Sequence, residues 1–191
     1  MNNNLDQIIN NTLRVLHDGG TVLYPTETIW GIGCDATNEN AIEKIYNIKK
    51  REQDKPLIIL IHDVKLLKKY IQNVPEIAYK IIRDEIKPIT VIYNNPINLP
   101  KTLIYKNTIG IRVVQNHEIK ILLKKFNKPL TSTSANISNN KTPIKFSDID
   151  EYIKNNVDYI VPINFIQSQQ TTNPSSVIKI HNDGSIKMIR N

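Results

Sequence analysis

The chain has 191 residues, of which 40% are hydrophobic and 23% are charged. This composition provides enough apolar material for the core of one domain, and it excludes collagen-like and disordered proteins. Lys and Arg outnumber Asp and Glu by 25 to 18, giving a formal net charge of +7 that favours polyanionic partners or indicates a solvated, lysine-rich surface. Cys34 is the only cysteine and no apolar run reaches about 20 residues, so we expect a cytoplasmic protein without membrane contact or disulfides.

Helical and strand patterns alternate along the whole chain. In order, they predict a helix over 5–16, a strand over 21–24, a helix over 41–50, a strand over 57–61, helices over 64–71 and 75–86, strands over 89–93 and 109–114, a helix over 118–126, a strand over 130–134, a helix over 147–155, and strands over 159–163, 177–180 and 186–190. Asp183-Gly184 is typical of a hairpin turn between the last two strands. No repeat or linker is visible, so we expect one α/β domain over 1–191 with a mixed sheet.

Residues 24–35, YPTETIWGIGCD, carry hydroxyls, a carboxylate and two glycines directly after a predicted strand. Ligands bind at strand ends in open α/β sheets, and the hydroxyls of Thr26 and Thr28 suit a small polar ligand. Gly31 and Gly33 permit close approach of the backbone. A capped turn without a ligand explains the same residues, so both interpretations stay open.

Residues 49–57, KKREQDKPL, place a group of basic residues at the end of a predicted helix and just before a buried strand. If Lys49, Arg51 and Lys55 point into one cleft, they can neutralise a triphosphate, and the guanidinium suits bidentate contacts with phosphate. Cations at this position also complement the carboxyl end of a helix without any ligand. The cluster is therefore a candidate phosphate site with a structural alternative.

Residues 128–138, KPLTSTSANIS, form a strand end rich in hydroxyls that runs into an amide. Small hydroxyls such as those of Ser132 and Ser134 donate hydrogen bonds to phosphate or carboxylate oxygens without adding bulk, and Asn136 adds an amide. Ser, Thr and Asn clusters are also common in loops that bind nothing. This segment indicates a binding site only in combination with the others.

Residues 108–113, TIGIRV, place Arg112 within an apolar strand. An arginine buried there needs an anion, which is either a substrate carboxylate or a carboxylate of the protein. Two further polar features, the NPSSV segment at 173–177 and Arg190, lie near the end of the chain. Motifs of P-loop NTPases, dinucleotide-binding folds, serine hydrolases and zinc proteases are absent from the sequence.

Taken in order, YPTETIWGIGCDA, KKREQDKPL, IGIRV, KPLTSTSANIS and NPSSVIKI resemble the YrdC/TsaC family of threonylcarbamoyl-AMP synthases, and the resemblance spans residues 19–190. It implies a single-domain, YrdC-like α/β fold with a twisted mixed parallel and antiparallel sheet, flanking helices and a basic concave cleft. Members join L-threonine, bicarbonate and ATP into threonylcarbamoyl-AMP and release pyrophosphate. A partner transferase then modifies the adenosine beside the anticodon of tRNA.

The resemblance also implies roles for individual residues. Because the carbamate of threonine attacks the α-phosphate of ATP, no side-chain nucleophile is required, and ATP brings Mg2+ without a protein-held metal. The residues implied for threonine are Thr28, Arg112, Ser132 and Ser176. Those implied for ATP are Lys49, Arg51, Lys55, Thr108, Ser134, Asn136, Thr142 and Arg190.

The chain departs from the family pattern at three positions. Leu60 stands where some relatives have a histidine that contacts threonine. Many relatives have Pro-Gly-Pro before a threonine, where this chain has Ile-Lys87-Pro, so a bulkier segment replaces the tight turn. Asn139 replaces a glycine after the Ser-Ala-Asn loop, and Asn tolerates left-handed backbone better than most residues. None of these changes removes a cation of the expected ATP site, so we expect activity to survive.

Two alternatives remain open at the level of the sequence. The first is a non-catalytic protein of the same fold that binds double-stranded RNA or tRNA, which predicts salt-dependent affinity without a need for ATP. Small hydroxyls and an aromatic content of only 6% argue against stacking platforms for RNA. The second is a divergent relative of the same fold that has lost the synthase reaction or carbamoylates another acceptor; the intact Lys-x-Arg and Ser-x-Asn patterns argue against a loss but do not identify the acceptor.

Overall fold

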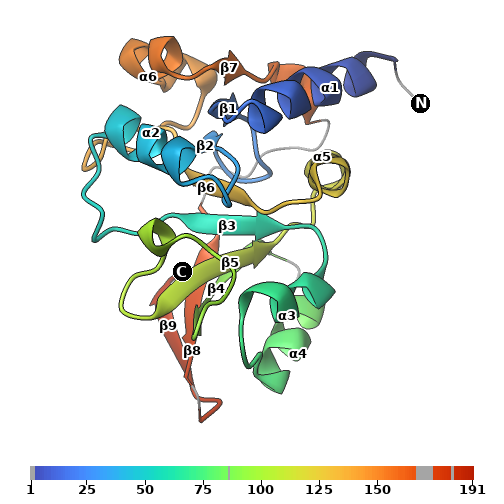
Figure 1. The fold of residues 1–191 in the computed structure, drawn as a ribbon, viewed down its shortest axis with the longest axis vertical. Helices are drawn as coiled ribbons and strands as arrows, with labels where there is room; N and C mark the ends of the chain where they lie inside the picture. Colours follow the sequence, from blue (N-terminus) through green and yellow to red (C-terminus); the bar gives the residue numbers. More distant parts are fainter. Residues whose placement is uncertain (1–2, 86, 167–173, 182) are drawn as a thin grey trace.

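The computed structural model describes residues 3–85, 87–166, 174–181 and 183–191. Its described strands form one twisted sheet in the order β7-β1-β2-β6-β3-β5-β4-β8-β9 (Figure 1). The strand bounds are β1 Val22–Tyr24, β2 Gly31–Gly33, β3 Ile58–Ile61, β4 Ile89–Asn94, β5 Thr108–Val113, β6 Leu130–Ser134, β7 Tyr159–Ile160, β8 Ser176–Ile180 and β9 Ile186–Arg190.

Parallel and antiparallel pairs are interspersed in this sheet. The pairs β1–β7, β3–β5 and β4–β8 are parallel, whereas β1–β2, β2–β6, β3–β6, β4–β5 and β8–β9 are antiparallel. The expected fold class, a mixed sheet with flanking helices, is confirmed. The α-helices are α1 Asn3–His17, α2 Glu39–Lys49, α3 Leu67–Tyr70, α4 Glu76–Asp84, α5 His117–Phe126 and α6 Glu151–Asn156.

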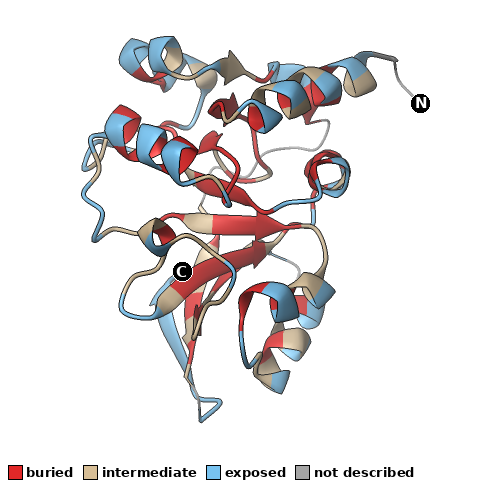
Figure 2. Ribbon diagram, viewed as in Figure 1, coloured by how far each residue is buried: buried red, intermediate tan, exposed pale blue. Residues whose placement is uncertain are grey.

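Hydrophobic side chains pack in two clusters that share the strands of the sheet. Figure 2 shows buried residues along the central strands and on one side of the helices. One cluster includes residues of α2, α3 and α4, and the other includes residues of α1 and α5. In β3, Ile59 and Ile61 join the first cluster and Leu60 joins the second. Successive side chains of a strand point to opposite faces, so the continuous apolar run of β3 is buried on both sides.

Most predicted elements are present within one to three residues of their predicted ends. The stretch 64–71 divides into a 3-10 turn, Val64–Leu66, followed by α3, and the helix predicted over 147–155 begins only at Glu151, after a 3-10 turn at Phe146–Asp148. Two further 3-10 turns, Lys101–Leu103 and Ile163–Phe165, were not expected. Residue 86 at the end of one predicted helix and residue 182 in the predicted hairpin lie outside the described residues.

Strand β2 was not predicted, because its glycines carry no strand pattern. It forms by pairing with β1 on one side and β6 on the other. A Cβ on Gly33 would overlap the Thr131 carbonyl, so a glycine is required for this close pairing. The segment 24–35, a candidate binding motif in the sequence, therefore also contains an internal strand of the sheet.

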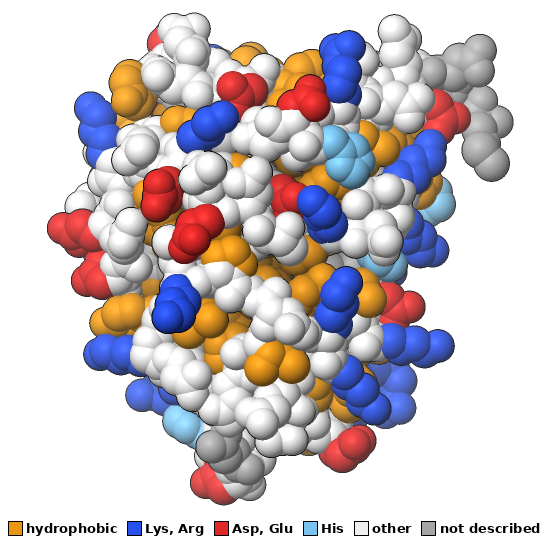
Figure 3. Space-filling view, viewed as in Figure 1, with side chains coloured by type: hydrophobic (Ala, Val, Ile, Leu, Met, Phe, Trp, Pro, Cys, Tyr) orange, Lys and Arg blue, Asp and Glu red, His pale blue; other side chains and the backbone are white. Residues whose placement is uncertain are grey.

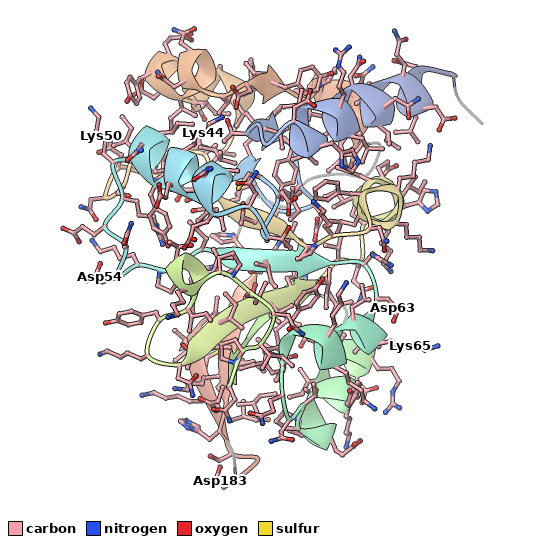
Figure 4. All side chains as sticks on the ribbon, viewed as in Figure 1. Lys44, Lys50, Asp54, Asp63, Lys65 and Asp183 are labelled. Atoms are coloured by element: carbon pink, nitrogen blue, oxygen red, sulfur yellow. The ribbon has the colours of Figure 1, made fainter. Side chains whose placement is uncertain are left out.

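Lys and Arg side chains are spread over the face shown in Figure 3, with Asp and Glu side chains among them. Figure 4 shows Lys50 and Lys65 at the edges of the molecule, and Lys44 is exposed as well. These side chains account for part of the +7 net charge as solvated lysines. Among the described helices, none is long and apolar enough to cross a lipid bilayer.

Candidate functional site

A cavity of about 200 Å³ lies among the β1–β2 loop and strands β3, β5 and β6. Its charged lining side chains in the described part of the chain are three arginines: Arg51 after α2, Arg112 on β5 and Arg190 on β9. The hydroxyl-bearing side chains of the lining are Thr26, Thr28, Ser132, Thr133, Ser134 and Thr142. Cations and small hydroxyls together suit a polar, anionic ligand.

Arg112 forms the inner end of this cavity and is only 7% exposed. Its Nη2 donates to Ser175 Oγ at 2.8 Å, its Nε donates to Thr90 Oγ1 at 3.3 Å, and its Nη1 lies 3.8 Å from Glu27 Oε1. Burial lowers the pKa of Arg112, while the Glu27 carboxylate opposes that change. Both interpretations of the buried arginine therefore apply, because it has a protein carboxylate nearby and still lines the cavity.

Hydroxyl groups surround the inner end. Tyr24 Oη donates to Ser132 Oγ at 2.9 Å, and burial raises the pKa of Tyr24, so the phenol stays protonated at neutral pH. Thr26 Oγ1 and Thr28 Oγ1 lie 2.9 Å apart, and the backbone N–H groups of Thr28 and Ile29 donate to Thr26 Oγ1. The capped turn considered for this loop is present, and it presents Thr28 to the cavity.

Arg51 and Arg190 form the rim of the cavity, where exposure is greater. Helix α2 ends at Lys49, the capping residue Lys50 adopts a left-handed conformation, and Arg51 follows this turn. Arg51 Nε donates to the Lys55 carbonyl at 2.7 Å, and Arg190 Nη2 donates to the Ser175 carbonyl at 3.0 Å. Partial burial lowers the pKa of both guanidinium groups, which nonetheless remain charged.

Lys49 is fully buried and contacts the backbone of Ser134, a residue of the cavity lining. Its Nζ donates to the carbonyls of Ser134 and Asn136, each at 2.5 Å, and burial lowers its pKa to about 7. The Asn136 amide in turn donates to the carbonyls of Ile137 and Asn140. Lys49 and Asn136 thus hold the loop after β6, and neither is part of the cavity lining.

Three other residues expected at the site lie outside the lining. Lys55 forms a partly exposed ion pair with Glu52 at 3.0 Å. The Thr108 hydroxyl donates to the Tyr105 carbonyl at the opposite end of β5 from Arg112. Ser176 pairs with Ile89 at the start of β8, and its neighbour Ser175 contacts Arg112 instead.

The three departures from the family pattern have clear structural surroundings. Leu60 is buried in the hydrophobic cluster with α1 and α5, and it is not a lining residue of the cavity. Asn139 adopts a φ of 68°, the left-handed conformation that Asn accepts. Lys87 is exposed and its backbone N–H donates to Glu85 Oε1, which leaves the cavity untouched.

Sequence reasoning missed Ser175 and Thr90, the two hydroxyls that hold Arg112. Both are buried polar residues, at 2% and 1% exposure. The sequence did indicate that a buried arginine needs hydrogen-bond acceptors. It does not say which hydroxyl groups lie beside that arginine in the folded chain. Glu27 was noted as a carboxylate of its motif without being assigned a partner.

Within the described residues, no group of three or more His, Cys, Asp or Glu side chains is arranged to hold a metal ion. Cys34, the one cysteine, is buried, and burial raises its pKa to about 12. The thiol is therefore protonated and unsuited to nucleophilic chemistry.

The chain is similar to proteins of known family. It is 37% identical over 175 residues to a Methanocaldococcus jannaschii protein that is provisionally named a threonylcarbamoyl-AMP synthase, covering 90% of this chain and 79% of the relative. It is 34% identical over 158 residues to the threonylcarbamoyl-AMP synthase of Pseudoalteromonas translucida, covering 78% and 82%.

Solved structures of Sua5 from P. abyssi have the same fold. The H234A/Y235A variant matches with a TM-score of 0.83 and 25% identity, and the complex with L-threonine matches with 0.76 and 26%. The matches cover 95% and 90% of this chain but only 55% and 50% of the Sua5 chains. This chain therefore corresponds to about half of Sua5.

A family model for Sua5, YciO and YrdC proteins, described as telomere recombination, matches residues 14–191. The match includes all five motifs and every residue of the cavity lining. The chain belongs to the Sua5/YciO/YrdC family.

Proposed function

We propose that this chain is an L-threonylcarbamoyladenylate synthase, a nucleotidyltransferase that forms threonylcarbamoyl-AMP and pyrophosphate from L-threonine, bicarbonate and ATP. The observation that carries the proposal is the buried Arg112 at the inner end of a cavity that Arg51 and Arg190 also line. Relatives named threonylcarbamoyl-AMP synthase and the binding of L-threonine by a Sua5 structure support it.

In this proposal the inner end receives threonine. Arg112 pairs with the substrate carboxylate, and the hydroxyls of Thr28 and Ser132 orient the amino acid. The threonine amine displaces hydroxide from bicarbonate, and the departing hydroxide takes an amine proton and leaves as water. The carbamate oxygen then attacks the α-phosphorus of ATP, and the bond to the pyrophosphate oxygen breaks.

The rim receives ATP. Arg51 and Arg190 offset the phosphate charge as it moves to the leaving pyrophosphate, with Ser134 and Thr142 as further donors. Lys49 and Asn136 act through the loop they hold. Lys55, Thr108 and Ser176 stay predictions from the family motifs. ATP carries Mg2+, which screens the phosphates, and the product passes to a transferase that modifies tRNA in the cytoplasm.

The proposal is tested by measuring pyrophosphate release from purified protein with ATP, Mg2+ and bicarbonate, with and without L-threonine. We expect release that depends on threonine and is not supported by L-alanine, which lacks the hydroxyl. Release that is equal without threonine would indicate a different reaction. Binding of double-stranded RNA together with no release under any condition would favour the non-catalytic alternative.

A further inference from the structure

Ser175 connects two of the three cavity arginines through different atoms. Its Oγ accepts a hydrogen bond from Arg112 Nη2 at 2.8 Å and lies 3.0 Å from Thr90 Oγ1. Its carbonyl oxygen accepts from Arg190 Nε at 3.3 Å and Nη2 at 3.0 Å. Ser175 is only 2% exposed and does not line the cavity, so it contacts the arginines from behind.

The two arginines come from different parts of the sheet. Arg112 lies on β5, and Arg190 is the last residue of β9, which pairs with β8. Strand β4 separates β5 from β8 in the sheet, and Thr90 on β4 also contacts both Arg112 and Ser175. The hydrogen bonds of Ser175 and Thr90 therefore form one continuous network beneath the inner end and the rim.

We infer that Ser175 is a positioning residue that couples the amino-acid end of the cavity to its nucleotide end. This inference rests on the proposed function for the identity of the two ligands. When an anion draws the Arg112 guanidinium to one position, Ser175 Oγ moves with it, and the Ser175 carbonyl transmits that position to Arg190. Because hydrogen bonds of charged donors are stronger than those between neutral groups, each arginine is held most firmly when the other is engaged.

Coupling of this kind has a thermodynamic signature. If threonine binds more tightly when the nucleotide is present, the nucleotide must bind more tightly by the same factor when threonine is present. Ser175→Ala removes the hydroxyl that holds Arg112 but keeps the carbonyl that holds Arg190. The variant therefore interrupts the link while leaving each arginine in the protein.

The experiment measures the dissociation constant of L-threonine by calorimetry, with and without a non-hydrolysable ATP analogue and Mg2+. For the wild-type protein we expect the analogue to tighten threonine binding by about fivefold or more, within the range of typical coupling. For Ser175→Ala we expect threonine alone to bind about tenfold more weakly, and the analogue to change its affinity by less than twofold.

A general loss of structure would lower affinity for both ligands, so the affinity of the ATP analogue alone is the second readout. It should change by less than about threefold in Ser175→Ala, because Arg190 keeps its carbonyl partner. Ser147→Ala, an exposed serine that bonds to Asp148, is the matched control for a lost hydroxyl and should behave as wild type.

Ser176→Ala separates the two serines of the motif. If the coupling factor falls with Ser176→Ala and stays at its wild-type value with Ser175→Ala, the inference is overturned. It is also overturned if the wild-type protein makes threonylcarbamoyl-AMP but shows no coupling between its ligands. A wild-type protein that binds neither threonine nor the ATP analogue would instead contradict the proposed function.

Discussion

The inner end and the rim of the cavity hold their arginines in different ways. Arg112 is buried and donates to side-chain hydroxyls of Ser175 and Thr90, whereas Arg51 and Arg190 are more exposed and donate to backbone carbonyls. A buried guanidinium with fixed partners has little freedom to adapt, so the inner end suits one small carboxylate. The more exposed rim can adjust to a larger polyphosphate, and solvent screens the interaction between the rim arginines and the phosphates more strongly.

The largest effect should follow from removing the inner cation. We expect Arg112→Ala to lower kcat/KM for threonine by about 100-fold, because the substrate carboxylate loses a buried, charge-assisted partner. The ATP analogue should still bind within about threefold of wild type. Initial rates at varied threonine concentration, together with calorimetry for the analogue, provide the measurement.

Arg83→Ala is the control for the loss of an arginine. Arg83 lies on α4 and pairs with Asp84 on the exposed surface. Its replacement should leave kcat/KM within twofold, since exposed pairs contribute little. If Arg112→Ala and Arg83→Ala were equally active, the inner end would not be the amino-acid site.

At the rim, Arg51→Ala should raise KM for ATP by about tenfold or more and lower adenylate formation to near background. Phosphate loses a bidentate partner that the neighbouring Lys55, occupied by Glu52, does not replace. The KM for threonine should change much less. A loss confined to threonine affinity would reverse our assignment of the two ends.

Next to the cavity lining, Lys49→Met should lower the free energy of unfolding by about 2 to 4 kcal/mol. The change leaves the Ser134 and Asn136 carbonyls without their buried donor. Lys50→Met is the matched control, because Lys50 is exposed and, within the described part of the chain, its ammonium group contacts only the face of the Tyr152 ring, with no buried carbonyl to leave unpaired (Figure 4). Urea unfolding of both variants checks the difference; equal stability would mean that Lys49 does not hold the loop.

Lys49 also predicts a pH dependence. Its pKa is about 7 in the folded protein, below the ordinary value of about 10.4 in the unfolded chain. Between these values the unfolded state binds more protons, so the stability of the wild-type protein relative to Lys49→Met should rise with pH above about 7 and level off near 10. If the free energies of unfolding of the two proteins changed with pH in parallel, Lys49 would keep its ordinary pKa in the folded protein.

The smallest effect concerns the turn that precedes Arg51. Lys50 has a φ of 47°, where glycine is free of strain, so Lys50→Gly should raise the free energy of unfolding by about 0.5 kcal/mol. Lys50→Ala loses the contact of Lys50 Nζ with the Tyr152 ring without relieving the backbone, and it should not stabilise. If Lys50→Ala raised the free energy of unfolding, the lysine side chain, and not the left-handed backbone, would be the source of the destabilisation at this position.

The sequence predicted the alternation of helices and strands because apolar periodicity is local. It did not predict β2, because Gly31-Ile32-Gly33 becomes a strand only through pairing with β1 and β6. The same distinction applies to the cations after α2. The motif predicted three in one cleft, whereas only Arg51 lines the cavity and Lys49 is used to hold a loop.

Ser175 and Ser176 show why the site was only partly predictable. The motif pointed to this pair of serines, but the choice between them depends on the pairing of β8 with β4 and on where Arg112 lies. These are tertiary facts that a motif does not contain. Family motifs therefore identified the segments of the site, and the fold determines which side chain of each segment reaches it.

The central claim is that the cavity joins threonine, bicarbonate and ATP. The most direct measurement is mass spectrometry of the product formed from L-threonine, ATP, Mg2+ and 13C-labelled bicarbonate. We expect threonylcarbamoyl-AMP that carries one 13C atom, with an equal amount of pyrophosphate. If folded protein that binds ATP yields only unlabelled adenylate or none, the account of this site is wrong.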